Sequence, residues 1–192
     1  MVRVLLNGKE SVFSENQFKN LGELYDRIAP KGMVLKRIII DDQEIETNKL
    51  SERLSEPLYD GERIVVDFVT PQKYLEDMLP SILNYIDTVI NLLPGVAGRV
   101  RELEPKAFKD IEDLSNAISA LEDLRQSVQA IVPVETDGST MVVVKLKNFL
   151  QALEKQDMSL IADCLEKDMP QVMRFYATLF EKALSKLREA RT

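Results

Sequence analysis

The sequence predicts an α+β protein in two parts: a domain of strands and one helix over residues 1–70, and an all-α antiparallel helical bundle over residues 71–192. The first observation behind this prediction is a series of short apolar stretches in residues 1–70, which have the two-residue period of strands and are separated by turn residues. The second is a change near Thr70 to the 3.6-residue period of helices. The third is the shortness of the segments between the helical stretches, which favours antiparallel neighbours.

The chain begins with a predicted β-hairpin. The stretch VRVLL (2–6) alternates in polarity and ends at Asn7-Gly8, a dipeptide typical of two-residue hairpin turns. KESVFS (9–14) returns as the second strand. FKNLGELYDRIAP (18–30) has its apolar residues at helical spacing, and its final proline ends the predicted helix.

Three further strands are expected in the first domain. LKRIII (35–40) is followed by a turn and a short return strand within DDQEIE (41–46). The segment LSERLSEPLYDGE (50–62) is predicted to be a connection that can hold a single helical turn, and it ends in an Asp-Gly turn. RIVVDF (63–68) then forms the last strand.

This order of strand, strand, helix, strand, short strand, strand resembles the ubiquitin-like β-grasp domain. The segments RIIIDDQEIE, LSERL and DGERIVVDF are similar to the second half of such a domain. The resemblance implies a β-grasp fold for residues 1–70 and a sheet face that binds protein partners. Sulfur-carrier members of this class need a flexible Gly-Gly end, but Thr70-Pro71 follows the last strand here, so a carrier role is not expected.

Strand alternation predicts which side chains face away from the helix of this domain. If Val4, Ile38 and Ile64 point inward, then Leu5, Arg37, Ile39, Val65 and Val69 point outward. Four of these outward residues are apolar, and contiguous exposed apolar patches usually serve a purpose. Either the helical part of the chain covers this face, or a partner protein binds it.

The first long helices are predicted from caps and prolines. Thr70 can cap a helix whose first residue is Pro71. Pro80 is expected to kink or break this helix, and PGVAG (94–98) to end it. A second helix is expected from about Glu104-Pro105 to Pro133.

The remaining segments are less uniform. Residues 140–154 fit either a hairpin strand or a helix, and the spacing of their apolar residues favours a helix capped by Ser139 or Thr140. Residues 157–187 carry a broad apolar stripe that Pro170 interrupts. Within this stripe, Met169, Met173 and Tyr176 are candidate partner-binding residues, either for a helix laid in a groove or for a second copy in a structural homodimer.

Composition argues against many enzyme classes and partners. The chain has no histidine and a single cysteine, which removes Ser-His-Asp and Cys-His catalysis as well as histidine and multi-thiolate metal sites. Its net charge is −7, with 10 basic and 13 acidic residues in 1–70, so nucleic acid and anionic membranes are not expected partners. We expect no cofactor, no membrane insertion and a cytoplasmic protein.

Two candidate chemical sites have simpler explanations. Cys164 lies on the apolar stripe and is expected to be a buried core residue. The carboxylates Asp110, Asp113, Asp163 and Glu166 could in principle hold a hard cation, but solvated charged faces explain them more simply. A metal- or small-ligand-binding bundle is therefore kept only as an alternative, with no metal ligand assigned.

These observations predict a non-enzymatic protein–protein interaction module: an adaptor, a chaperone-like binder or an assembly factor. Its expected surfaces are the outer sheet face and the apolar stripe of the last helix. The stretch NFLQALEKQDMSLIADCLEKDMPQVMRFYATLF (148–180) also resembles uncharacterised small bacterial proteins, some linked to flagellar and motility genes. That resemblance implies a flagellar or secretion-associated accessory role and assigns no residue a function.

Overall fold

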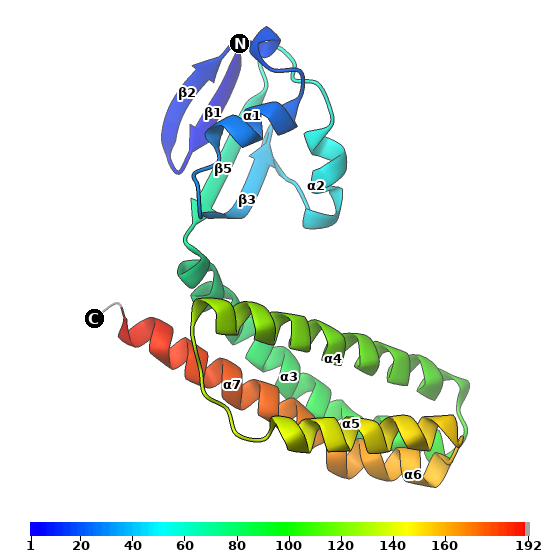
Figure 1. Cartoon of the computed structure of the whole chain (residues 1–192). Coiled ribbons are helices and arrows are strands. Elements are labelled where there is room, and N and C mark those ends of the chain that lie inside the picture. The colour runs from blue at the N-terminus through cyan, green and yellow to red at the C-terminus, as the bar shows by residue number, and fades with distance from the viewer. Residues whose placement is uncertain (191–192) are drawn as a thin grey trace. The chain divides into compact units, whose positions relative to one another are not determined.

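In the computed structural model, which describes residues 1–190, the chain divides into two compact units, Met1–Tyr74 and the residues from Leu75 onward (Figure 1). We call them the sheet unit and the helical unit. The first contains a five-stranded mixed sheet and the second consists of helices, which confirms the predicted α+β class. Each unit has its own cluster of buried apolar residues.

The sheet unit is built on the strand order β2-β1-β5-β3-β4. Its elements are β1 (Val2–Leu6), β2 (Lys9–Phe13), a short 3-10 turn (Glu15–Gln17), α1 (Leu21–Ile28), β3 (Val34–Ile40), β4 (Gln43–Glu44), α2 (Thr47–Leu54) and β5 (Arg63–Val69). The central strands β1 and β5 run parallel, and the other neighbours are antiparallel. Helix α1 lies across one face of the sheet (Figure 1).

The predicted hairpin and the predicted alternation are confirmed. Asn7 and Gly8 both have positive φ, 45° and 82°, as a two-residue turn of this hand requires. Val4, Ile38 and Ile64 are buried against Leu21 and Leu24 of α1. The hydrophobic core of this unit therefore lies between the helix and one face of the sheet.

Two elements of the sheet unit differ from the sequence expectation. Helix α1 begins at Leu21 rather than near Phe18, because Asn20 caps it by accepting a hydrogen bond from the Glu23 N–H at 2.9 Å. Helix α2 has eight residues where the sequence suggested a connection with a single helical turn. Its Leu50 and Leu54 pack against the sheet-unit core, and such tertiary packing stabilises helices too short to form alone.

The helical unit contains α3 (Pro71–Arg101) from Leu75 onward, its first residues up to Tyr74 belonging to the sheet unit. The helices that follow are α4 (Pro105–Ile131), α5 (Ser139–Glu154), α6 (Met158–Asp163), a π-helical segment (Cys164–Asp168) and α7 (Met169–Glu189). The predicted start of α3 is confirmed, since the Thr70 hydroxyl accepts a hydrogen bond from the Lys73 N–H at 3.2 Å. The predicted helix α4 is also confirmed, with Pro105 in its first turn. Helices α4 and α5 run in opposite directions, and both pack against α7 (Figure 1).

Helix α3 does not end where the sequence suggested. It continues without interruption past Pro80 and through PGVAG to Arg101. A proline in a helix removes one backbone hydrogen bond. Here Val96, Ala97 and Val100 are buried in the helical-unit core, and their burial offsets that loss.

The ambiguous segment 140–154 is helical, as its apolar spacing favoured, but its cap differs from the prediction. Gly138 precedes the first residue of α5 and has a φ of 108°, which favours glycine. Neither Ser139 nor Thr140 is the cap, because both lie inside the first turn.

The interruption predicted at Pro170 takes the form of a π-helical segment. The Met169 N–H donates to the Cys164 carbonyl, five residues earlier, which is the π-helical pattern. Pro170 has no N–H to continue the preceding α-helical pattern. The segment therefore joins α6 to α7 within one nearly continuous helical run.

Candidate functional site

The outer face of the sheet unit carries a row of apolar side chains across its three central strands. Leu5 of β1 lies opposite Val65 of β5, and Val65 lies opposite Ile39 of β3. All three side chains are half-buried, and none belongs to either hydrophobic core. The strand register thus brings together three of the residues predicted for this face, which we call the apolar row.

Charged residues end the apolar row at both edges of the sheet. Glu10 of β2 lies opposite Leu5, and Glu44 of β4 lies opposite Ile39. Both glutamates are exposed. Edge charges of this kind discourage sheets from pairing edge to edge. They also give the apolar row a polar rim.

The other two residues predicted for this face lie beside the apolar row. Arg37 of β3 and Asp67 of β5 are opposite each other and form an ion pair, with Nε 2.6 Å from Oδ2. Val69 of β5 is opposite Val34 of β3, beyond a bulge in that strand. Arg37 is about half exposed, so its ion pair contributes little to stability and remains accessible to a partner.

The three residues predicted on the last helix do not form an exposed surface. Met169, Met173 and Tyr176 are at most 2% exposed and belong to the core of the helical unit. The broad stripe that suggested an open surface is covered by α4 and α5, which both pack against α7. The apolar stripe of a helix is wide when several other helices pack on it. The sequence of that one helix does not give the number of helices that do so.

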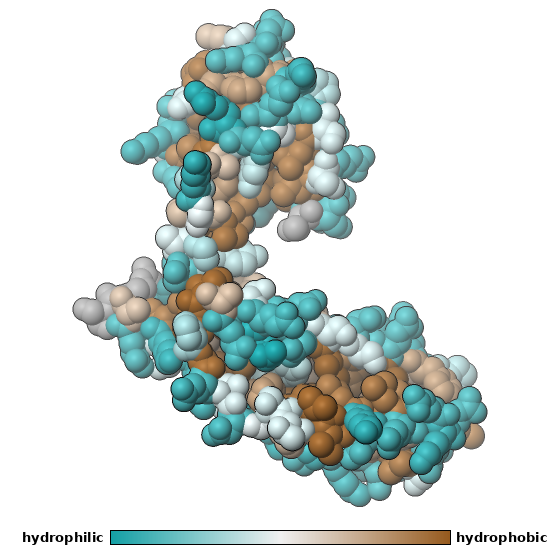
Figure 2. All heavy atoms as spheres, viewed as in Figure 1, coloured by the Kyte–Doolittle hydropathy of each residue, from teal (hydrophilic) through white to brown (hydrophobic). Residues whose placement is uncertain are grey.

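Tyr176 nevertheless lines a hollow of about 680 Å³ between α4 and α5, which we call the α4–α5 groove. Its floor includes Phe175 and Tyr176 of α7, and Val143 and Leu146 of α5 form one wall. The other wall belongs to α4 and consists of Ile118, Ser119, Glu122, Asp123 and Arg125. Figure 2 shows hydrophobic residues at the surface between these two helices.

A polar network joins the α4 wall of this groove to its floor. The Arg125 guanidinium donates to both carboxylate oxygens of Glu122, from Nε at 2.8 Å and from Nη2 at 2.5 Å. The Tyr176 hydroxyl donates to the same carboxylate at 3.2 Å. The hydrogen bonds from Arg125 hold the pKa of Glu122 below its ordinary value, whereas burial raises the pKa of Tyr176 to about 12. The carboxylate therefore stays charged and the phenol stays neutral at neutral pH.

Sequence reasoning did not identify this network. The spacing of Glu122 and Arg125, three residues apart on one helix, is a readable signal of an ion pair. Tyr176 lies 54 residues away from Glu122 along the chain. Only the packing of α4 against α7 brings the two together.

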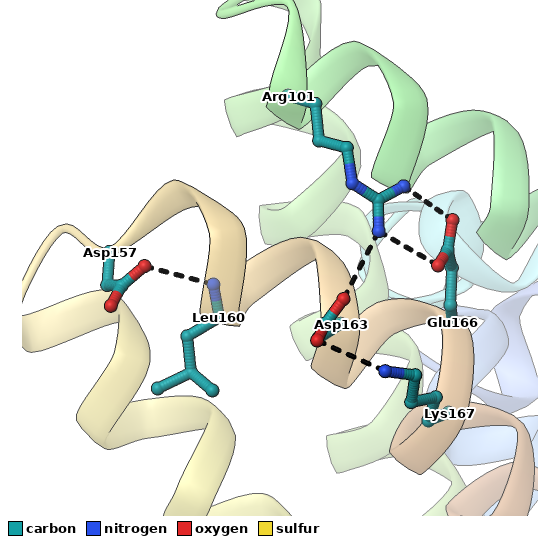
Figure 3. A network of polar contacts seen from close by, with 6 residues as sticks. All are labelled: Arg101, Asp157, Leu160, Asp163, Glu166 and Lys167. Carbon is teal, nitrogen blue, oxygen red and sulfur yellow. Dashed lines mark hydrogen bonds and ion pairs between the residues drawn. The ribbon is translucent and has the colours of Figure 1, made fainter.

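Three of the four acidic residues considered as metal ligands, Asp110, Asp163 and Glu166, instead accept hydrogen bonds from cationic side chains. Arg101 at the end of α3 donates to both oxygens of Glu166, at 2.6 and 2.9 Å, and to Asp163 at 3.3 Å (Figure 3). Asp163 also pairs with Lys167, and Asp110 accepts two hydrogen bonds from Arg99. Within residues 1–190, no group of three or more histidine, cysteine or acidic side chains is arranged to hold a metal ion.

Cys164 is buried in the helical-unit core, as its place on the apolar stripe predicted. Burial raises the pKa of its thiol, and the neighbouring carboxylate of Asp168 acts in the same direction. Asp168 itself pairs with Lys145 at 2.5 Å. The thiol is therefore held in its protonated, less nucleophilic form.

Comparison with protein-family models, with curated proteins and with solved structures finds no match to this chain. In the part of the chain that the structure describes, no helix combines the length and the apolar character needed to cross a lipid bilayer.

Proposed function

We propose that this chain is a non-enzymatic adaptor or assembly factor that binds a protein partner through the outer face of its sheet unit. In this proposal the sheet unit is a ubiquitin-like β-grasp domain and the helical unit is an antiparallel bundle. Two central parallel strands with a helix across one face support the β-grasp assignment. Short connections between long helices support the bundle.

The observation that carries the proposal is the apolar row of Leu5, Val65 and Ile39. These side chains lie on three adjacent strands, face away from the sheet-unit core and are surrounded by charged residues. An apolar centre with a polar rim is the usual anatomy of a protein-binding surface. The buried thiol of Cys164 and the lack of histidine agree with a binding role rather than a catalytic one.

The proposal is tested by affinity purification from the native cell with Val65→Glu as the altered bait. Val65 occupies the middle of the apolar row, so a charge there faces any partner seated on it. We expect the partner captured by the wild-type chain to be lost with Val65→Glu. Val144→Glu, the same change at an exposed valine of α5, should capture the partner as the wild type does.

The fold of each bait is checked by circular dichroism before the comparison. An equal capture by the wild type and by a folded Val65→Glu variant would remove the outer sheet face as the binding surface. Slower or faster amide exchange in the helical unit of Val65→Glu would instead support internal docking of that unit on the sheet.

A further inference from the structure

We propose that the α4–α5 groove is a second binding site, which takes an amphipathic helix of a protein partner with basic residues along one flank. This site lies wholly within the helical unit and does not depend on the outer sheet face. Its walls and its floor are helices, and a further helix can pack its side-chain ridges into the grooves between theirs.

The α5 wall presents apolar side chains at the spacing that another helix matches. Val143, Leu146 and Leu150 follow one another at intervals of three and four residues, so they share one side of α5. Val143 is 65% exposed and Leu150 is 58% exposed, although both are aliphatic. The stripe from Val143 to Leu150 is about 10 Å long, which corresponds to two turns of a partner helix.

The floor supplies a deeper apolar contact that is already fixed in place. Phe175 is half-buried and meets the ring of Tyr176 edge to face, with centroids 5.4 Å apart. Tyr176 is held in turn by its hydrogen bond to Glu122. Such rigid aromatic residues are favoured anchors because a partner gains contact area on them at little entropic cost.

The α4 wall determines the charge of the occupant. Between Lys109 and Arg125, this helix carries five acidic residues and no basic one. Glu112, Ser119 and Asp123 are exposed and lie seven and four residues apart, so they share one side of α4, and Ser119 and Asp123 line the groove. Arg125 compensates Glu122, which leaves Asp123 as the net charge of the lining. An acidic rim beside an apolar wall complements a helix that is apolar on one face and basic on the adjoining flank.

The probe is a synthetic helical peptide with leucines at i, i+3, i+4 and i+7 and lysines on one flank, labelled for fluorescence anisotropy. The full chain should bind this peptide, and the same peptide with glutamates in place of the lysines should bind at least about tenfold more weakly. That comparison needs no variant of the protein, so it does not depend on how any substitution folds.

Matched variants locate the site. Val143→Lys and Asp123→Lys should each weaken binding about tenfold, because they place a positive charge in the groove against a basic helix. Val144→Lys and Asp113→Lys change the net charge equally at exposed positions outside the lining, and they should weaken binding by no more than about twofold. Val65→Glu on the sheet unit should leave peptide binding unchanged, which separates this site from the proposed function.

Three results would overturn the proposal. The first is equal binding of the basic and acidic peptides, or no binding of either. The second is an equal effect of the lining variants and their matched controls in chains that circular dichroism shows to be folded. The third is a dimer in light scattering that Val143→Lys, but not Val144→Lys, converts to a monomer, since the groove would then be filled by a second copy of this chain.

Discussion

At the residue scale, Tyr176 illustrates how a polar group is accommodated in an apolar core. Its ring is only 2% exposed, and its hydroxyl would lose hydrogen bonds on burial without a protein partner. Glu122 supplies that partner from α4. Burial raises the pKa of the phenol to about 12, since the phenolate would be both desolvated and next to a carboxylate.

The Tyr176→Phe variant should reveal this environment in the pH dependence of stability. Near neutral pH we expect the free energy of unfolding to fall by about 1 kcal/mol, because one hydrogen bond is lost. The raised pKa means that the phenol stabilises the fold below pH 10 and that this contribution is lost as pH rises towards about 12. The wild-type and variant stabilities, measured by urea unfolding, should therefore converge and cross in that window. Parallel curves of stability against pH for the wild type and the variant would show that Tyr176 does not cause this loss of stability.

A buried ion pair in the sheet unit gives a second residue-scale prediction. Glu62 is fully buried, and its carboxylate pairs with Arg53 and accepts a hydrogen bond from the Tyr59 N–H. Arg53→Met should cost about 3–5 kcal/mol of unfolding free energy, because it leaves a buried charge without its partner.

The double variant Arg53→Met with Glu62→Leu provides the control for this pair. Removing both charges should recover most of the lost stability, because no buried ion then remains. Urea unfolding of the two single variants and the double variant measures the coupling. If the stability losses of the two single variants add up to the loss of the double variant, the two residues are not coupled.

At the scale of elements, the prolines of the helical unit differ in how much they destabilise their helices. Pro94 stands inside α3 and is exposed, so its missing backbone hydrogen bond has no compensation from its own side chain. Pro105 stands in the first turn of α4, where its missing N–H would have had no helical partner.

Pro94→Ala should therefore stabilise the helical unit by about 1–2 kcal/mol, a net value after the greater chain entropy of the unfolded variant is allowed for. Pro105→Ala is the matched control and should change stability by no more than about 0.5 kcal/mol. Chemical denaturation followed by circular dichroism measures both. Equal effects of the two substitutions would contradict the positional argument.

At the scale of the whole molecule, the two cores share no residue. Leu24 is buried in the sheet-unit core and Leu179 in the helical-unit core, both with no measurable exposure. Each core is made within its own unit, so each unit has its own source of stability.

The same substitution in each core tests this independence. Leu24→Ala and Leu179→Ala should each destabilise their own unit by about 2–5 kcal/mol. Hydrogen exchange with mass spectrometry should show faster exchange in the sheet unit for the first variant and in the helical unit for the second. Faster exchange in both units for either variant would show that they unfold together.

Several features of this protein follow from the sequence alone. Strand period placed Val4, Ile38 and Ile64 in the core and turned Leu5 and Val65 outward, because alternation in a strand is a local property of the backbone. Turn and cap residues likewise act on their own neighbours, so the Asn7-Gly8 turn and the Thr70 cap were predictable. Element types and most boundaries depend on such local effects.

The tertiary structure alone decided the features that require particular helices to pack side by side. Helix α3 continues past Pro94, because residues beyond that proline are buried in the core. The tertiary structure placed Met169 and Met173 in the core, because α4 and α5 both pack against α7. It also formed the α4–α5 groove, since Glu122 and Tyr176 lie 54 residues apart and meet only through packing. Contacts between distant segments are set by the summed burial of many side chains, and no single stretch of sequence specifies that sum.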